Sequence, residues 1–108
     1  MKLTIRARHL DLSPELRDQI HRRLDFALGR LTSEIEAVDI TVADLNGPKG
    51  GADKQCRVRI RGRSLGALVV EHVGSEILPA MSLAADRAER AVVRALARRR
   101  RFGPALTA

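Results

Sequence analysis

The C-terminal third of the chain repeats apolar and basic residues with the 3.6-residue period of an α-helix. Across residues 75–101, one face of such a helix carries Ile77, Met81, Ala84, Ala85, Ala88, Val92, Ala95 and Leu96. A second face, about 135° round the helix at about 100° per residue, carries the row that we name the arginine ridge: Arg87, Arg90, Arg94, Arg98 and Arg101. We predict a helix that is capped by Ser75, ends at Gly103-Pro104, packs on a core by its apolar face and exposes the arginine ridge.

Alternation of apolar and polar residues predicts three β-strands in the rest of the chain, and a fourth strand with mixed faces follows them. We place them at residues 2–8, 38–45, 56–61 and 65–73. The third strand has the clearest pattern, with Cys56, Val58 and Ile60 alternating with Arg57, Arg59 and Arg61. Because Cys56 lies on the apolar side, we expect a small buried core residue rather than a nucleophile.

A second helix is predicted between the first two strands. Ser13-Pro14-Glu15 combines an N-cap serine, a proline at the first helical position and an acid in the first turn. An apolar stripe then continues to about Arg30. The resulting order β-α-β-β-β-α predicts a two-layer α+β fold, in which a four-stranded sheet packs both helices on one face. The other face would be exposed and carry Arg57, Arg59 and Arg61.

Length and charge narrow the function. The 108 residues suit one domain, which we place at 1–101, with a short C-terminal tail at 102–108. The formal net charge is +7, and 17 of the 20 basic residues are arginine, whose planar fork suits phosphate. Such a domain usually binds nucleic acid, or less often an anionic membrane surface. Aromatic residues make up 2% of the chain, so we expect binding through backbone charge and shape rather than base stacking.

Other chemistry has little support in the sequence. No nucleophile elbow, paired-carboxylate or triad pattern is present, and the three histidines and one cysteine lack metal-ligand spacing. We expect no enzyme activity, cofactor, metal or small-molecule substrate. The N-terminus has no signal-peptide pattern and no apolar run approaches ~18 residues, so we expect a cytoplasmic protein without a membrane partner. Lys49 and Lys54 lie in a Gly-rich loop that could follow a phosphate backbone.

Several segments together resemble the short ribosome hibernation-promoting factor and protein Y family. They are MKLTI at 1–5, RHLDLSPELR at 8–17, DLNGPKGGADKQC at 44–56 and DRAER at 86–90. The resemblance covers about residues 1–100 and includes the β-α-β-β-β-α order. One departure lies at residues 76–82, where the family often has an aromatic residue and a second acid.

The resemblance implies a bacterial ribosome hibernation factor of the stress response that regulates translation. It implies binding to 16S rRNA in the decoding channel of the small ribosomal subunit, where occupancy blocks the mRNA and tRNA sites. The family's basic positions correspond here to Arg87, Arg90 and Arg94, and also to Arg23 and Arg30. Since the dimerisation domain of the long family members is missing, we expect a monomer off the ribosome that does not dimerise ribosomes by itself.

Two other functions fit the same residues. A general double-stranded RNA or DNA-binding protein would use the arginine ridge on any duplex. A regulatory module would present the same arginines to an acidic protein partner. Tight binding to a random duplex RNA would favour the first of these.

Overall fold

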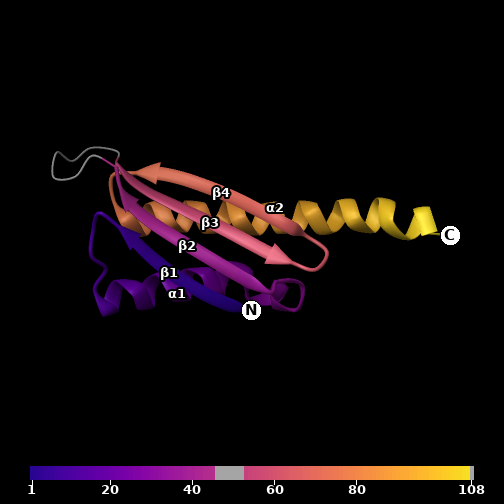
Figure 1. Ribbon diagram of the computed structural model, residues 1–108, viewed down its shortest axis with the longest axis horizontal. Coiled ribbons are helices and arrows are strands. Elements are labelled where there is room, and N and C mark those ends of the chain that lie inside the picture. Colours follow the sequence, from indigo (N-terminus) through magenta and orange to yellow (C-terminus); the bar gives the residue numbers. More distant parts are fainter. Residues whose placement is uncertain (46–52, 108) are drawn as a thin grey trace.

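The computed structural model describes the backbone of residues 1–45 and 53–107 and the side chains of 1–45 and 53–99. Along the chain, the elements are β1 (Lys2–Arg8), α1 (Pro14–Leu28), the 3₁₀ helix η1 (Gly29–Glu34), β2 (Ala37–Asp44), β3 (Lys54–Gly62), β4 (Gly66–Gly74) and α2 (Ile77–Thr107). Figure 1 shows the four strands lying over the two helices. The predicted β-α-β-β-β-α order is confirmed.

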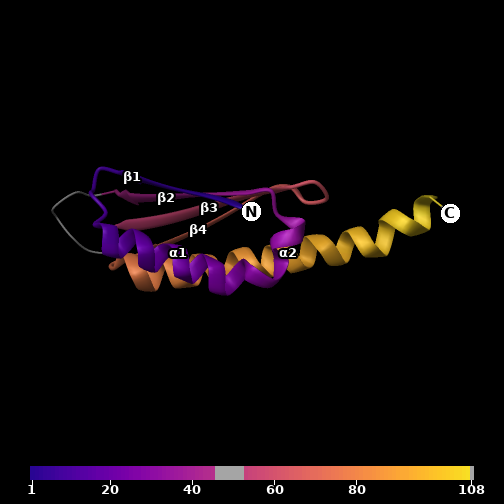
Figure 2. The same cartoon turned by 90° about the horizontal axis from the view of Figure 1, so that it is seen from below.

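The strands form one mixed sheet in the order β1-β2-β3-β4. β1 and β2 are parallel, because α1 crosses over between them. β3 is antiparallel both to β2 and to β4, and among the described residues no helix lies between these strands in the chain. Both helices lie on one face of the sheet (Figure 2). The predicted two-layer α+β architecture is therefore confirmed.

The hydrophobic core lies between the sheet and the helices. Cys56, Val58 and Ile60 are fully buried on the inner face of β3, while the arginines between them are exposed on the outer face, as predicted. The helices complete the core with their apolar stripes, including Ile20 and Leu24 of α1.

α1 begins as predicted but ends earlier. The Ser13 side chain accepts a hydrogen bond from the Leu16 backbone N–H at 3.1 Å, which makes Ser13 the N-cap. The α-helix stops at Leu28, not at about Arg30, and continues as the 3₁₀ helix η1. Glycine at position 29 lowers helix stability, and the tighter turn carries Leu31 into the core.

Both predicted ends of α2 are wrong. The first helical carbonyl is that of Glu76, which accepts from the Ala80 N–H at 3.2 Å, so Glu76 rather than Ser75 precedes the helix. At the other end α2 continues through Gly103 and Pro104 to Thr107. These residues weaken a helix by about 1 and 3 kcal/mol, but extending a helix that is already formed avoids the cost of nucleation.

α2 is much longer than the sheet that it supports. Its 31 residues span about 46 Å at 1.5 Å per residue, whereas the nine residues of β3 span about 30 Å. The helix therefore extends past the end of the sheet (Figures 1 and 2), and its last buried position described is Leu96. This projection gives the molecule its long axis of 57 Å.

Candidate nucleic-acid interface

The arginine ridge lies on the side of α2 that is turned away from the core. Arg87, Arg90, Arg94 and Arg98 are all exposed, and the side chain of Arg101 lies outside the described residues. Arg87 donates a hydrogen bond at 2.7 Å to the backbone carbonyl of Glu71 in β4, an edge strand. The ridge thus begins beside the β4 edge and follows α2 toward the end that projects past the sheet.

The two arginines predicted on the first helix occupy a different side of α2. Arg23 of α1 donates to the Ser82 hydroxyl, and Arg30 of η1 pairs with Glu89 at 3.2 Å. Both contacts cross the seam where α1 and α2 pack side by side. Arg30 remains 67% exposed, so its charge is still available to a ligand. The structure therefore separates these arginines from the arginine ridge.

Of the two lysines predicted in the Gly-rich loop, Lys54 is instead the first residue of β3, paired in register with Asp44 of β2. Lys54 lies 3.0 Å from a carboxylate oxygen of Asp53 and 3.4 Å from one of Asp44. The hydrogen bond to Asp53 raises the pKa of Lys54 above its ordinary value. Because two carboxylates neutralise this ammonium group, phosphate would have to compete for it. Lys49 lies outside the described residues.

A second basic surface covers the outer face of the sheet. Strand register brings β1 and β3 to either side of β2, with Arg6 aligned to Thr41 and Thr41 aligned to Arg57. The exposed basic residues of this outer sheet face are Lys2, Arg6, Arg8, Arg57, Arg59 and Arg61. Its acidic residues, among the described strands, are Asp39 and Glu71. Both layers of the molecule therefore present positive charge to solvent, which favours polyanionic partners.

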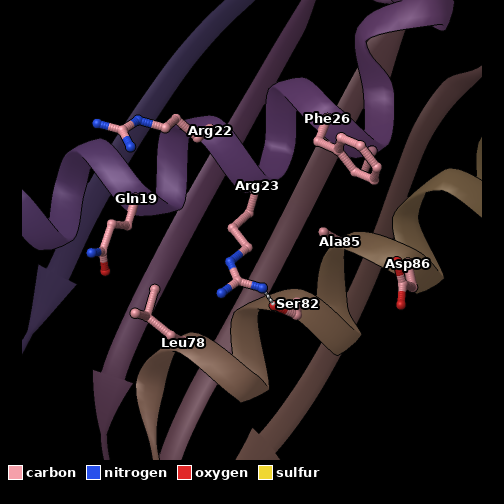
Figure 3. A pocket seen from close by; sticks show the side chains of 9 residues that line it. Gln19, Arg22, Arg23, Phe26, Leu78, Ser82, Ala85 and Asp86 are labelled. Atoms are coloured by element: carbon pink, nitrogen blue, oxygen red, sulfur yellow. Dashed lines mark hydrogen bonds between the residues drawn. The ribbon is translucent and has the colours of Figure 1, made fainter.

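One exposed residue lay outside the sequence prediction. Phe26 of α1 is 94% exposed and stands at the seam between α1 and α2 (Figure 3). A hollow of about 660 Å³ lies between the helices at this point. Phe26 falls outside the apolar stripe of its helix. An aromatic residue at such a position was the feature of the sequence that could have indicated an exposed ring.

Cys56 is a core residue and not a reactive one, as predicted. Its thiol is fully buried, and burial raises its pKa from 9.0 to about 11. A thiol in this state is a poor nucleophile at neutral pH. Within residues 1–45 and 53–99, no group of three His, Cys, Asp or Glu side chains is placed to hold a metal ion. Among the described residues, no helix has the length and apolarity needed to cross a membrane.

The fold is shared with solved structures. A ribosomal subunit interface protein from Coxiella burnetii superposes with a TM-score of 0.73 at 16% identity, over 90% of this chain and 99% of that one. The N-terminal domain of Protein Y from Thermus thermophilus superposes with a TM-score of 0.70 at 19% identity, over 87% and 98%. No curated protein sequence matches this chain.

A match to a protein family covers nearly the whole sequence. The model of the family described as "Sigma 54 modulation protein / S30EA ribosomal protein" matches residues 3–100. This range spans every strand, both helices at the sheet and most of the arginine ridge. The chain belongs to the sigma-54 modulation protein / S30EA ribosomal protein family.

Proposed function

We propose that this protein binds the rRNA of the small ribosomal subunit through its arginine ridge. The folded body then occupies the decoding channel and blocks the mRNA and tRNA sites, so translation is inhibited by occupancy without chemistry. The observation that carries the proposal is the exposed row Arg87, Arg90, Arg94 and Arg98 in a chain of this family. The names of the similar structures, ribosomal subunit interface protein and Protein Y, support it.

The physical basis is phosphate neutralisation. An arginine side chain offers a planar fork that binds a phosphate through two hydrogen bonds. Each such contact releases counterions, so affinity falls with salt. For about six contacts, the affinity should drop by roughly 10³ between 50 and 200 mM salt.

Reversing the charge of the arginine ridge tests whether this surface binds rRNA. The combined substitutions Arg87→Glu, Arg90→Glu and Arg94→Glu should abolish co-sedimentation with small subunits, because carboxylates repel the phosphates that the arginines bind. These side chains point away from the core, so the variant should keep the wild-type circular dichroism spectrum.

A matched control separates this surface from net charge. Arg57→Glu, Arg59→Glu and Arg61→Glu on the outer sheet face change the net charge by the same amount, two per residue, from +7 to +1. This variant should keep most of the binding. Equal loss in both variants would show that overall charge, not the arginine ridge, governs binding. Unchanged sedimentation of the ridge variant would contradict the proposal directly.

Competition tests the location. Binding of the wild-type protein should be stoichiometric with small subunits and should be displaced by tRNA with mRNA. Binding that is indifferent to tRNA would place the protein elsewhere on the subunit.

A gel shift on random duplex RNA tests whether the protein is specific for the ribosome, since tight binding to any duplex would favour a general duplex-binding protein.

A further inference from the structure

The seam between α1 and α2 has a repeating arrangement with one gap. Arg23, Phe26 and Arg30 follow one another at helical spacing along the side of the first helical segment that faces α2. On either side of Phe26, a side chain crosses the seam: Arg23 reaches Ser82, and Arg30 reaches Glu89. Phe26 lies between these two contacts.

A hollow extends along the seam on both sides of the Arg23–Ser82 contact and reaches Phe26, where the residue across the seam, Ala85, is small. The pocket, about 660 Å³, is lined by Ala85 and Ala27 where larger side chains would fill it. Figure 3 shows the Phe26 ring beside Ala85, with Asp86 near the ring and Arg23 across the middle of the seam. We name this hollow the interhelical pocket. Its volume falls within the range of small-ligand sites, roughly 300–1,000 Å³.

Packing within the protein does not account for Phe26. A phenylalanine that served to join the helices would be largely buried, whereas this side chain is 94% exposed. The next residue, Ala27, is buried and belongs to the face of α1 that packs into the core. An exposed aromatic ring beside a hollow and cationic side chains is the arrangement that proteins use to stack unpaired bases.

We propose that the interhelical pocket takes an unpaired nucleobase of RNA, stacked on the ring of Phe26. The inference builds on the proposed function, since rRNA would supply the base. The Arg23 guanidinium lines the pocket, where it donates to Ser82, and is placed for a flanking phosphate. Asp86 and Gln19 line the same pocket and offer hydrogen-bonding groups to the edge of a base. A carboxylate accepts hydrogen bonds, so Asp86 suits a donor on the edge of the base, such as the amino group of adenine.

Charge favours RNA over an apolar protein segment as the occupant. Arg22 and Arg23 both line the pocket, and Arg30 follows on the same seam. Arg22 is paired with Asp18, and Arg23 is bound to a neutral hydroxyl, so Arg23 keeps an unneutralised charge in that contact. A polyanion can place a base on Phe26 and a phosphate on Arg23 at once, which a purely apolar side chain cannot.

A tryptophan at position 26 would report stacking directly. The chain contains no Trp and no Tyr, so Phe26→Trp introduces a single indole. Its fluorescence should be quenched by single-stranded oligo(A), and much less by fully paired duplex RNA with the same number of phosphates. Val69→Trp is the matched control, since Val69 is 45% exposed on the outer sheet face and aligned with Arg59. Equal quenching in both variants, or none at position 26, would overturn the proposal.

A truncation separates stacking from charge. Phe26→Ala should weaken binding to small subunits by about five- to a hundred-fold while leaving the slope of log affinity against log salt unchanged. Substitutions in the arginine ridge should instead reduce that slope. Unchanged affinity of Phe26→Ala would overturn the proposal while leaving the ribosomal function standing.

The two hypotheses fail in different ways. If wild-type protein does not bind ribosomes but oligo(A) still quenches the indole at position 26, base binding stands and the ribosomal function is wrong. If Phe26→Ala weakens ribosome binding but no RNA quenches the indole, the occupant is a protein side chain, and the nucleobase proposal is wrong.

Discussion

Cys56 and Arg57 are neighbours in the chain and lie in opposite surroundings. Side chains alternate between the two faces of a strand, so β3 buries Cys56 completely and leaves Arg57 in solvent. A shift of one residue would reverse this and place arginines in the core. Residue type and strand period therefore agree, which sets the register of β3 against its neighbours.

Burial of Cys56 predicts a pH effect on stability. Its pKa is about 11 in the folded protein and about 9 in the unfolded chain, where the thiol is exposed. Ionisation therefore favours the unfolded chain, so this contribution to stability is complete below about pH 9 and declines as the pH rises toward 11. Urea unfolding at several pH values should show the decline.

A variant without a thiol isolates this effect. Cys56→Ala should lose this part of the pH dependence, although the smaller side chain should lower stability at every pH. In the wild-type protein, a thiol reagent at neutral pH should react far faster after denaturation than before. Rapid reaction of the native protein would contradict the buried placement of Cys56.

The end of β3 lies very close to the end of the 3₁₀ helix η1. At Gly62, an added Cβ would lie 2.2 Å from the backbone carbonyl oxygen of Glu34 in η1. The following Glu36 N–H donates to the Arg61 carbonyl at 2.8 Å, which holds the two segments together. Because backbone lies on both sides of this contact, a side chain at position 62 cannot be accommodated by a rotamer change.

Gly62→Ala should therefore destabilise the protein. We expect a loss of about 1–3 kcal/mol, measured by urea unfolding followed by circular dichroism. Gly29→Ala is the matched control, since Gly29 has helical φ and ψ of −56° and −38° and open space around its Cβ position. That variant should be neutral or more stable by up to about 1 kcal/mol. Equal stability of the two variants would contradict the tight approach of β3 to η1.

At the scale of the whole molecule, positive charge lies on two surfaces with different shapes. The arginine ridge follows a helix that projects past the sheet, whereas the outer sheet face is broad and includes Asp39 and Glu71. Both surfaces contribute to the long-range attraction of a polyanion. The steep salt dependence comes from direct contacts between side chains and phosphates. We expect the arginine ridge to make these contacts, because its helix projects from the body of the protein.

The salt dependence should therefore distinguish the two surfaces. Arg90→Gln combined with Arg94→Gln should reduce the slope of log affinity against log salt by about 0.7–0.9 for each phosphate that is no longer neutralised. Arg57→Gln combined with Arg59→Gln should leave the slope nearly unchanged. Small-subunit binding measured between 50 and 200 mM salt would test this. An equal reduction by both pairs would show that the outer sheet face also contacts phosphate.

Local periodicity was enough to predict most of the fold. The strands, the buried Cys56 and the exposed arginines of β3 follow from the spacing of apolar residues, because strand geometry turns spacing into direction. The Ser13 cap follows from the residue types of Ser13-Pro14-Glu15. The ends of helices were less predictable. Gly103 and Pro104 disfavour a helix locally, yet α2 passes through them as the extension of a helix already formed.

The sequence by itself determined the layers of this protein and the exposure of Arg87, Arg90, Arg94 and Arg98, since both depend on spacing within single elements. The tertiary structure decided the partners of several cations, among them Arg23 with Ser82, Arg30 with Glu89, Arg87 with the Glu71 carbonyl and Lys54 with its two carboxylates. It also decided that Phe26 stands beside a pocket. The partners of Arg23 and Arg30 lie 59 positions away in the chain, so only packing of α1 against α2 brings them together.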